Sequence, residues 1–183
     1  MHINNMNCSS RKSKRSKVVL LALLCLSCLA RAEQPLIPTN EIVVEGKVKT
    51  KRVVRMEDLK KMKSVALENI NTSCSPRTPE TSINVIAVPL LDILDSIAFD
   101  VPGKGALNSF YFKFVASDGY TVVYSYNEIF NTDTGMHMYL VTEIDGKDIA
   151  TLEKRMLLLT TNDIKSGRRN IKGLSRIVVC QAE

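Results

Sequence analysis

The chain has 183 residues and a formal net charge of +6, a balance that taken whole would suggest a basic protein that binds nucleic acid. The placement of the charges argues against that class, because residues 1–32 hold six basic side chains and no acidic one, and the other 151 residues carry 19 of each sign. With 45% hydrophobic and 24% charged residues, the composition is that of one ordinary globular domain.

Residues 1–32 have the three zones of a secretory signal peptide: a basic stretch, an apolar run over 18–30 and a small-residue triplet ending at Ala32. As a helix, the apolar run would cover only about 20 Å of a hydrocarbon core roughly 30 Å thick. Soluble export with cleavage after Ala32 is therefore predicted. Two alternatives stay open: a lipoprotein signal acylated at Cys25 or Cys28, and an uncleaved anchor.

Cleavage would leave two cysteines, Cys74 and Cys180. In an oxidising compartment they could pair, and a disulfide that closes a loop of about a hundred residues contributes up to roughly 4.7 kcal/mol in the chain-entropy model. Their positions in the sequence do not show that they meet in space. Buried unreactive thiols, or a functional thiol at Cys74, are the alternatives.

The first half of the exported chain begins with a proline-containing tether over 33–40, and the domain is expected to span 41–183. Clusters of β-branched residues predict strands, whereas apolar residues at helical spacing with acids in the first turn predict a helix. The expected elements are a hairpin or two short strands over 41–54, a short helix over 56–62, a strand over 65–70 and a loop over 71–82.

The second half is expected to be richer in strands. Proline followed by leucines at i, i+4 and i+7 predicts a core helix over 88–97, and two Asp-Gly pairs predict hairpin turns. The remaining elements are a hairpin over 110–126 that turns at Ser117-Asp118-Gly119, a helical turn capped by Asn127, a hairpin from 139–144 through Asp145-Gly146, and strands over 156–161 and 176–180.

This gives seven to nine short strands and two or three short helices that do not alternate strictly. The pattern predicts an α+β fold, mainly β, with mixed sheets and a few short helices in one domain.

Few catalytic chemistries have the residues they need. His137 is the one histidine beyond the signal peptide, which removes multi-histidine metal sites, and the sequence has no Gly-x-Ser-x-Gly nucleophile elbow. The basic loop over 165–172 is more informative, because Arg168, Arg169 and Lys172 could hold a phosphate through guanidinium and ammonium contacts. The alternative is that this loop is simply solvated.

Several segments occur in an order that resembles the small molybdopterin-binding oxidoreductase domains of the sulfite oxidase superfamily. No single motif is specific, and the order carries the resemblance. The segments are Ile42-Val43-Val44-Glu45-Gly46-Lys47-Val48, Met56-Glu57-Asp58-Leu59, Val88-Pro89-Leu90-Leu91-Asp92-Ile93-Leu94, Ala116-Ser117-Asp118-Gly119-Tyr120, Asp145-Gly146-Lys147, and the stretch from Gly167 to Val179.

The resemblance implies a mixed-sheet fold that holds a pterin dithiolene with its phosphate and, in active members, a molybdenum bound by one cysteine. Carried across, Arg169 and Lys172, with the adjacent Arg168, match the segment that approaches the pterin and its phosphate. Arg155 is what remains of the histidine-glycine-x-proline-x-arginine stretch of active enzymes. Cys74 lies where the metal cysteine is expected and is the candidate metal thiolate and catalytic residue.

The chain also departs from the superfamily, since Gly173 stands where its tryptophan is expected and only His137 could contact a pterin. The first hypothesis is therefore an exported, non-catalytic module with an eroded cofactor site that binds a small ligand or an exported partner protein. The alternative is a molybdenum-pterin-dependent oxidoreductase that passes electrons to an exported redox partner. A third is an unrelated exported β-rich protein. Molybdopterin is implied by resemblance only, and a membrane partner is expected only if the chain is lipidated.

Overall fold

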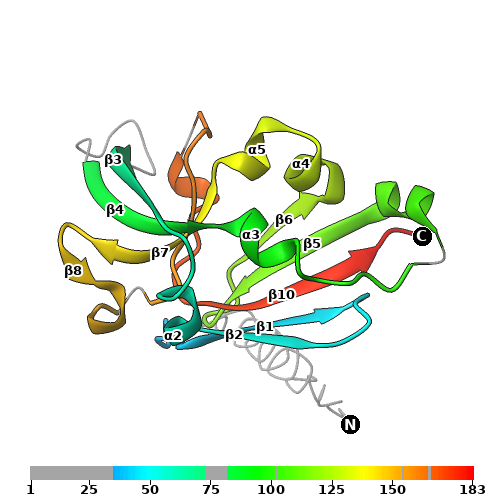
Figure 1. Cartoon of the computed structure of the whole chain (residues 1–183), viewed down its shortest axis with the longest axis horizontal. Helices are drawn as coiled ribbons and strands as arrows, with labels where there is room; N and C mark the ends of the chain where they lie inside the picture. Colours follow the sequence, from blue (N-terminus) through cyan, green and yellow to red (C-terminus); the bar gives the residue numbers. More distant parts are fainter. Residues whose placement is uncertain (1–34, 73–81, 102, 154, 165) are drawn as a thin grey trace, which may run out of the picture. The chain divides into compact units, whose positions relative to one another are not determined.

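The computed structural model describes residues 35–72, 82–101, 103–153, 155–164 and 166–183 (Figure 1). The predicted signal peptide, the cleavage position and Cys74 lie outside these residues. The described residues form ten strands in two sheets, with four short α-helices and three 3-10 turns. The predicted fold class, α+β and mainly β, is confirmed.

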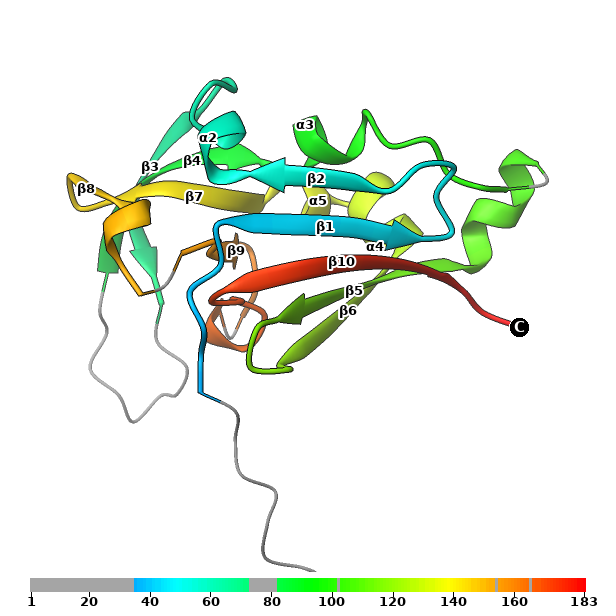
Figure 2. The same ribbon diagram turned by 90° about the horizontal axis from the view of Figure 1, so that it is seen from below.

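The first sheet has the strand order β2-β1-β10-β5-β6. Only β1 and β10 run parallel in it, and its other neighbours are antiparallel, so the sheet is mixed as expected (Figure 2). Its strands are β1 (Glu41–Gly46), β2 (Arg52–Arg55), β5 (Phe110–Ala116), β6 (Thr121–Ser125) and β10 (Leu174–Gln181).

The second sheet has the order β3-β4-β7-β8, and β9 pairs with β7 beside that path. All of its pairings are antiparallel. Its strands are β3 (Val65–Asn71), β4 (Ser82–Pro89), β7 (Met138–Ile144), β8 (Lys147–Asp148) and β9 (Leu158–Thr160).

The helices are all short. They are α2 (Met56–Leu59), α3 (Leu90–Leu94), α4 (Tyr126–Phe130) and α5 (Asp133–Met136), with 3-10 turns η1 (Lys104–Ser109), η2 (Ile149–Thr151) and η3 (Ser166–Arg168). None of the helices in the described ranges has the length and apolarity needed to cross a bilayer.

The helix expected over 88–97 is shorter than predicted, and the strand before it was missed. Val88 and Pro89 end β4, where they pair with β7, and the helix covers only Leu90–Leu94. The leucine spacing is genuine, since Leu90 and Leu94 are both buried. Strand β4 lies between β3 and β7, inside the sheet, so its sequence does not alternate strictly between apolar and polar residues as a half-exposed strand does.

The cap of α4 is Ser125, not Asn127. The Ser125 hydroxyl accepts from the backbone N–H of Glu128 at 3.1 Å, and a Glu128 carboxylate oxygen accepts from the Ser125 N–H at 2.9 Å. This reciprocal arrangement is a capping box, which needs Glu three residues after the cap. The Ser-x-x-Glu spacing in the sequence carried this signal, and the prediction of Asn127 overlooked it.

Both Asp-Gly turns are confirmed. In the β5–β6 turn, Gly119 has φ +85° and its N–H donates to Ala116, whose own N–H donates to the Tyr120 carbonyl. That is the three-residue hairpin in which glycine takes the left-handed position. In the β7–β8 turn both Asp145 (φ +47°) and Gly146 (φ +76°) are left-handed, as a two-residue hairpin requires.

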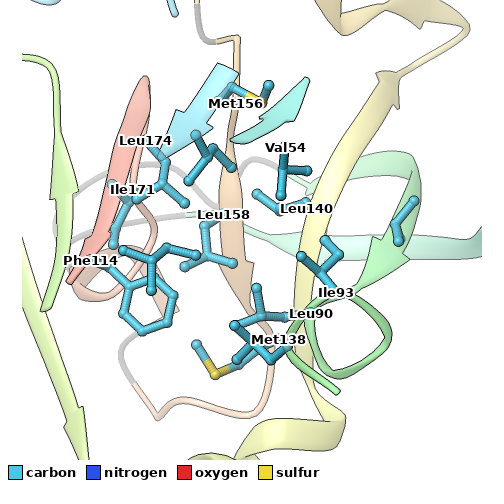
Figure 3. Packing of buried hydrophobic residues seen from close by; sticks show 14 of the residues in the cluster. Val54, Leu90, Ile93, Phe114, Met138, Leu140, Met156, Leu158, Ile171 and Leu174 are labelled. Carbon is cyan, nitrogen blue, oxygen red and sulfur yellow. The ribbon is translucent and has the colours of Figure 1, made fainter. Parts of the chain in front are cut away.

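The hydrophobic core lies between the inner faces of the two sheets (Figure 3). Strand β5 supplies Phe110, Phe112 and Phe114, whose alternation with half-buried neighbours is the period-two pattern that predicted this strand. The second sheet contributes Leu140 and Leu158, both fully buried. The core thus fixes the mutual position of the β5–β6 hairpin and the chain around β9, which is where the candidate site lies.

Candidate functional site

The basic loop predicted from the sequence connects β9 to β10 and is attached at both flanks. Ile171 and Leu158 exchange backbone hydrogen bonds at 2.9 Å, which hold the end of the loop against β9. On the other side, the Tyr120 hydroxyl donates to the carbonyl oxygen of Arg168. The loop is therefore tied to the β5–β6 hairpin of the first sheet and to the second sheet.

These attachments enclose a pocket of about 460 Å³. Its floor comes from the second sheet and the chain leading into β9, and it is aliphatic. The floor residues are Ile83, Ile144, Leu157 and Leu159. The rim is polar and comes from the hairpin, the basic loop and the end of β3, with Asp118, Tyr120, Arg168, Asn170, Lys172 and Thr72.

Two of the four predicted cofactor-binding cations, Arg168 and Lys172, line this pocket and are exposed. Neither side chain has an ion-pair partner among the residues that the structure describes. The acid on the same rim is Asp118, whose Oδ1 accepts from the Tyr120 N–H at 2.9 Å. The rim therefore offers two positive groups that no carboxylate in the described part of the chain neutralises.

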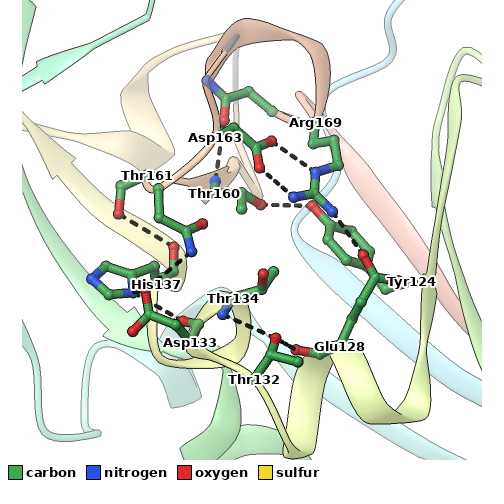
Figure 4. A network of polar contacts seen from close by, with 12 residues as sticks. Tyr124, Glu128, Thr132, Asp133, Thr134, His137, Thr160, Thr161, Asp163 and Arg169 are labelled. Atoms are coloured by element: carbon green, nitrogen blue, oxygen red, sulfur yellow. Dashed lines mark hydrogen bonds and ion pairs between the residues drawn. The ribbon is translucent and has the colours of Figure 1, made fainter.

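Arg169, the third predicted cation, does not line this pocket. Its Nε donates to Asp163 Oδ2 at 2.7 Å, its Nη2 donates to Asp163 Oδ1, and its Nη1 lies 3.2 Å from Glu128 Oε1 (Figure 4). Its guanidinium carbon is 4.6 Å from the centre of the Tyr124 ring. The hydrogen bonds that Arg169 donates to Asp163 raise the pKa of Arg169 above its ordinary value. The guanidinium is thus neutralised inside the domain by two carboxylates.

The fourth predicted cation, Arg155, contacts the tether. Its Nη1 donates to Asn40 Oδ1 at 3.0 Å, while its Nε is buried without a hydrogen-bond partner. Its carbonyl accepts from the N–H of Gly173 at 3.0 Å. Arg155 therefore joins the start of β1 to the start of β10 and does not line the pocket.

Below Arg169 lies a buried polar pair. The Tyr124 hydroxyl and Thr160 Oγ1 are 2.7 Å apart, and Asn170 Oδ1 accepts from the Thr160 N–H at 3.1 Å. Burial raises the pKa of Tyr124 to about 12. The phenol therefore stays neutral and joins β6 to β9 beneath the loop.

Replacing Tyr124 with phenylalanine is expected to lower the free energy of unfolding at pH 8 by about 1–3 kcal/mol, because Thr160 loses its buried partner. The deficit should shrink as pH rises. Folding raises the pKa of Tyr124 from about 10, so the unfolded chain loses the proton first and the parent loses about 1.4 kcal/mol by pH 11. Urea denaturation of both proteins at pH 8 and pH 11 measures this, and a deficit that is independent of pH would contradict it.

His137 lies in a neighbouring part of the same polar network. Its Nδ1 is 3.2 Å from Asp133 Oδ2, and Asn162 Nδ2 donates to that oxygen at 3.4 Å. Met136 and Met138 flank His137 in the sequence, but Met136 is 61% exposed whereas Met138 is buried in the core. The two thioether sulfurs therefore do not form a common metal site with the His137 imidazole. Within the described ranges, no group of three or more histidine, cysteine, aspartate or glutamate side chains is placed to hold a metal ion.

Sequence reasoning missed most of the pocket. It identified the cations of the loop but not the aliphatic floor, because Ile83, Ile144 and Leu159 come from three strands and have no common motif. It also missed Asp163 and Glu128 as the partners of Arg169. The sequence did offer a signal for the pair with Asp163, because Asp163 and Arg169 carry opposite charges and lie six residues apart in one loop, where they can meet.

The comparisons with known proteins bear on the fold. No protein-family model matches the chain, and no curated protein matches it in sequence. The structure is similar to that of the sulfane dehydrogenase SoxCD from Paracoccus pantotrophus, with a TM-score of 0.55 and 12% identity. The likeness covers 76% of this chain and 37% of that one, so this chain spans little more than a third of its length. At this identity the likeness shows the fold alone, a loose relation to the sulfite-oxidase-type fold that the sequence resemblance implied.

The described part of the pocket lining offers few polar side-chain partners for the ring of the pterin that the resemblance implies. A pterin ring carries donors and acceptors along its edge, and each one left unpaired costs about 1–3 kcal/mol. The floor here is aliphatic, Asn170 Oδ1 is occupied by Thr160, and the Tyr120 hydroxyl is occupied by Arg168. The other polar side-chain groups of the described lining include the Asp118 carboxylate, the Asn170 amide nitrogen and the two cations, and the cations fit a phosphate or another anion.

Proposed function

We propose that this domain is an exported, non-catalytic binding module whose pocket takes a small amphipathic anion. The single observation that carries the proposal is one pocket of about 460 Å³ that combines an aliphatic floor with two rim cations that form no ion pair with any residue the structure describes. The anionic group would lie between Arg168 and Lys172, and the apolar body would lie on the floor.

The two halves of the pocket contribute in different ways. A guanidinium binds a phosphate or carboxylate with two parallel hydrogen bonds, and an ammonium adds a point charge. The aliphatic floor rewards apolar area at about 25 cal/mol per Å² removed from water. A polar body would forfeit that second contribution, so the module should select apolar anions over polar ones.

Calorimetric titration with octyl phosphate tests this function. Octyl phosphate should bind, whereas inorganic phosphate and octanol, which each keep only half of the recognised chemistry, should bind at least tenfold more weakly. The double variant Arg168→Ser/Lys172→Ser should weaken octyl phosphate at least tenfold. The matched variant Lys47→Ser/Lys49→Ser removes the same charge at the far end of β1 and should change nothing.

Two results would overturn the proposal. Equal affinity for inorganic phosphate and octyl phosphate would show that the floor is not used. Near-stoichiometric molybdenum and pterin in protein purified from a cofactor-competent exporting host would instead support the oxidoreductase alternative, with Cys74 as the metal thiolate. Mass spectrometry of the exported protein tests the proposed cleavage after Ala32.

A further inference from the structure

Strand β6 is an edge strand of the first sheet and pairs only with β5 (Figure 2). The hydrogen bond from the Ala116 N–H to the Tyr120 carbonyl shows that the carbonyl group of Tyr120 faces β5. Backbone direction alternates along a strand, so Thr121 and Val123 point their N–H and C=O groups away from the sheet. The Ser125 N–H, which follows the same alternation, donates to Glu128 instead of to β5.

The outward groups of Thr121 and Val123 are open to solvent. Both residues are exposed, Val123 at 52%, and no backbone or side-chain hydrogen bond beyond the β5 ladder reaches their N–H or C=O from any described residue. An exposed valine in the middle of an open edge is a ready template for another strand.

The other sheet edges carry the features that block such pairing. Strand β2 has an arginine at each end, and β3 carries Glu68 and a break in its register. Strands β8 and β9 have only two and three residues, and β9 is buried and bridged to Ile171. Strand β6, Thr-Val-Val-Tyr-Ser, has no charge, no proline and no register break. Charges, bulges and shortness are how proteins protect their edges, so β6 is the one described edge without protection.

We propose that β6 binds an extended acidic segment of a partner protein, which adds to the first sheet as a strand. Main-chain hydrogen bonds to Thr121 and Val123 would supply affinity. The charge preference comes from Lys113, which lies one strand in from the edge, directly across from Val123 on the outer face. Lys113 has no ion-pair partner among the described residues, and a carboxylate on the added strand would lie within reach of its flexible stem.

A short peptide fits this edge better than a second copy of the chain. Strand β6 is five residues long, its open backbone groups are those of Thr121 and Val123, and it is bounded by the β5–β6 turn at one end and by α4 at the other. A stable dimer needs roughly 1,200 Å² or more of buried surface, which a pairing of two such strands does not supply by itself. A second β6 also brings no carboxylate to Lys113, because the strand is uncharged.

Amide hydrogen exchange with a capped hexapeptide of alternating glutamate and valine tests the proposal. In the free protein, the Thr121 and Val123 amides should exchange fast while the Val122 and Tyr124 amides are protected. Saturating peptide should slow the Thr121 and Val123 amides at least tenfold. The same peptide with an N-methyl group on every residue, which leaves neither edge able to donate, or with lysine in place of glutamate, should not.

Two variants separate edge pairing from loose contact. Val123→Glu keeps the backbone donor but sets a like charge beside the acidic peptide, so it should weaken binding at least tenfold. Val123→Gln has the shape of that glutamate without its charge and should bind the peptide as the parent does. Equal binding by both variants would overturn the proposal. Protection of Thr121 and Val123 that depends on protein concentration without peptide would also overturn it, in favour of a second copy.

Discussion

Replacing Arg169 with methionine is expected to lower the free energy of unfolding by about 2–4 kcal/mol. The guanidinium is shared between Asp163 and Glu128 and lies over the Tyr124 ring, so its loss leaves the Asp163 carboxylate, whose side chain is only 12% exposed, without a countercharge. Removing one member of a buried pair costs about 3–5 kcal/mol, and the value here is lower because 27% of the Arg169 side chain remains exposed.

Urea denaturation of the parent and the variant measures this loss. The matched control is Arg176→Met, since Arg176 contacts Glu45 at 3.7 Å with 52% of its side chain exposed, and its loss should cost less than about 1 kcal/mol. The comparison also decides what Arg169 does. A variant with unchanged stability that no longer bound octyl phosphate would show a binding role, contrary to the internal ion pairs that the structure shows.

Replacing Gly46 with alanine is expected to cost at least about 3 kcal/mol. Gly46 has φ +95°, where an L side chain is strained by about 1–2 kcal/mol, and a Cβ there would lie 2.1 Å from the carbonyl oxygen of Val179. That carbonyl belongs to β10 and accepts from the Lys47 N–H, so it cannot move without disturbing the parallel β1–β10 pairing.

Two other glycines separate the causes of this loss. Gly119 has φ +85° but open space around it, so Gly119→Ala reports the backbone strain alone, at about 1–2 kcal/mol. Gly105 has neither a left-handed backbone nor a close neighbour, so Gly105→Ala should leave the unfolding midpoint unchanged. If Gly46→Ala lowered the midpoint of thermal unfolding no more than Gly119→Ala does, the predicted clash with the Val179 carbonyl would be contradicted.

The sequence by itself determined what depends on near neighbours. The alternation of Phe110, Phe112 and Phe114 predicted β5, and the Asp-Gly pairs predicted both hairpin turns, because strand faces and turn conformations are set by a few adjacent residues. The charge asymmetry likewise separated residues 1–32 from a neutral domain. The α+β class follows from such local elements.

Only the tertiary structure decided which side chains meet. Four cations looked alike in the sequence, yet Arg168 and Lys172 line the pocket while Arg169 is taken by Asp163 and Glu128, and Arg155 by Asn40. The choice depends partly on partners far away in the chain, Glu128 for Arg169 and Asn40 for Arg155, and partly on how the loop folds Asp163 back onto Arg169.

The same holds for β4 and for the open edge of β6. Strand β4 became a strand because it pairs with both β3 and β7, which overrode the local helical signal at Val88 and Pro89. Strand β6 became an edge because of the order in which distant strands pair. Pairing partners and burial are long-range properties, so the periodicity of a single segment does not contain them.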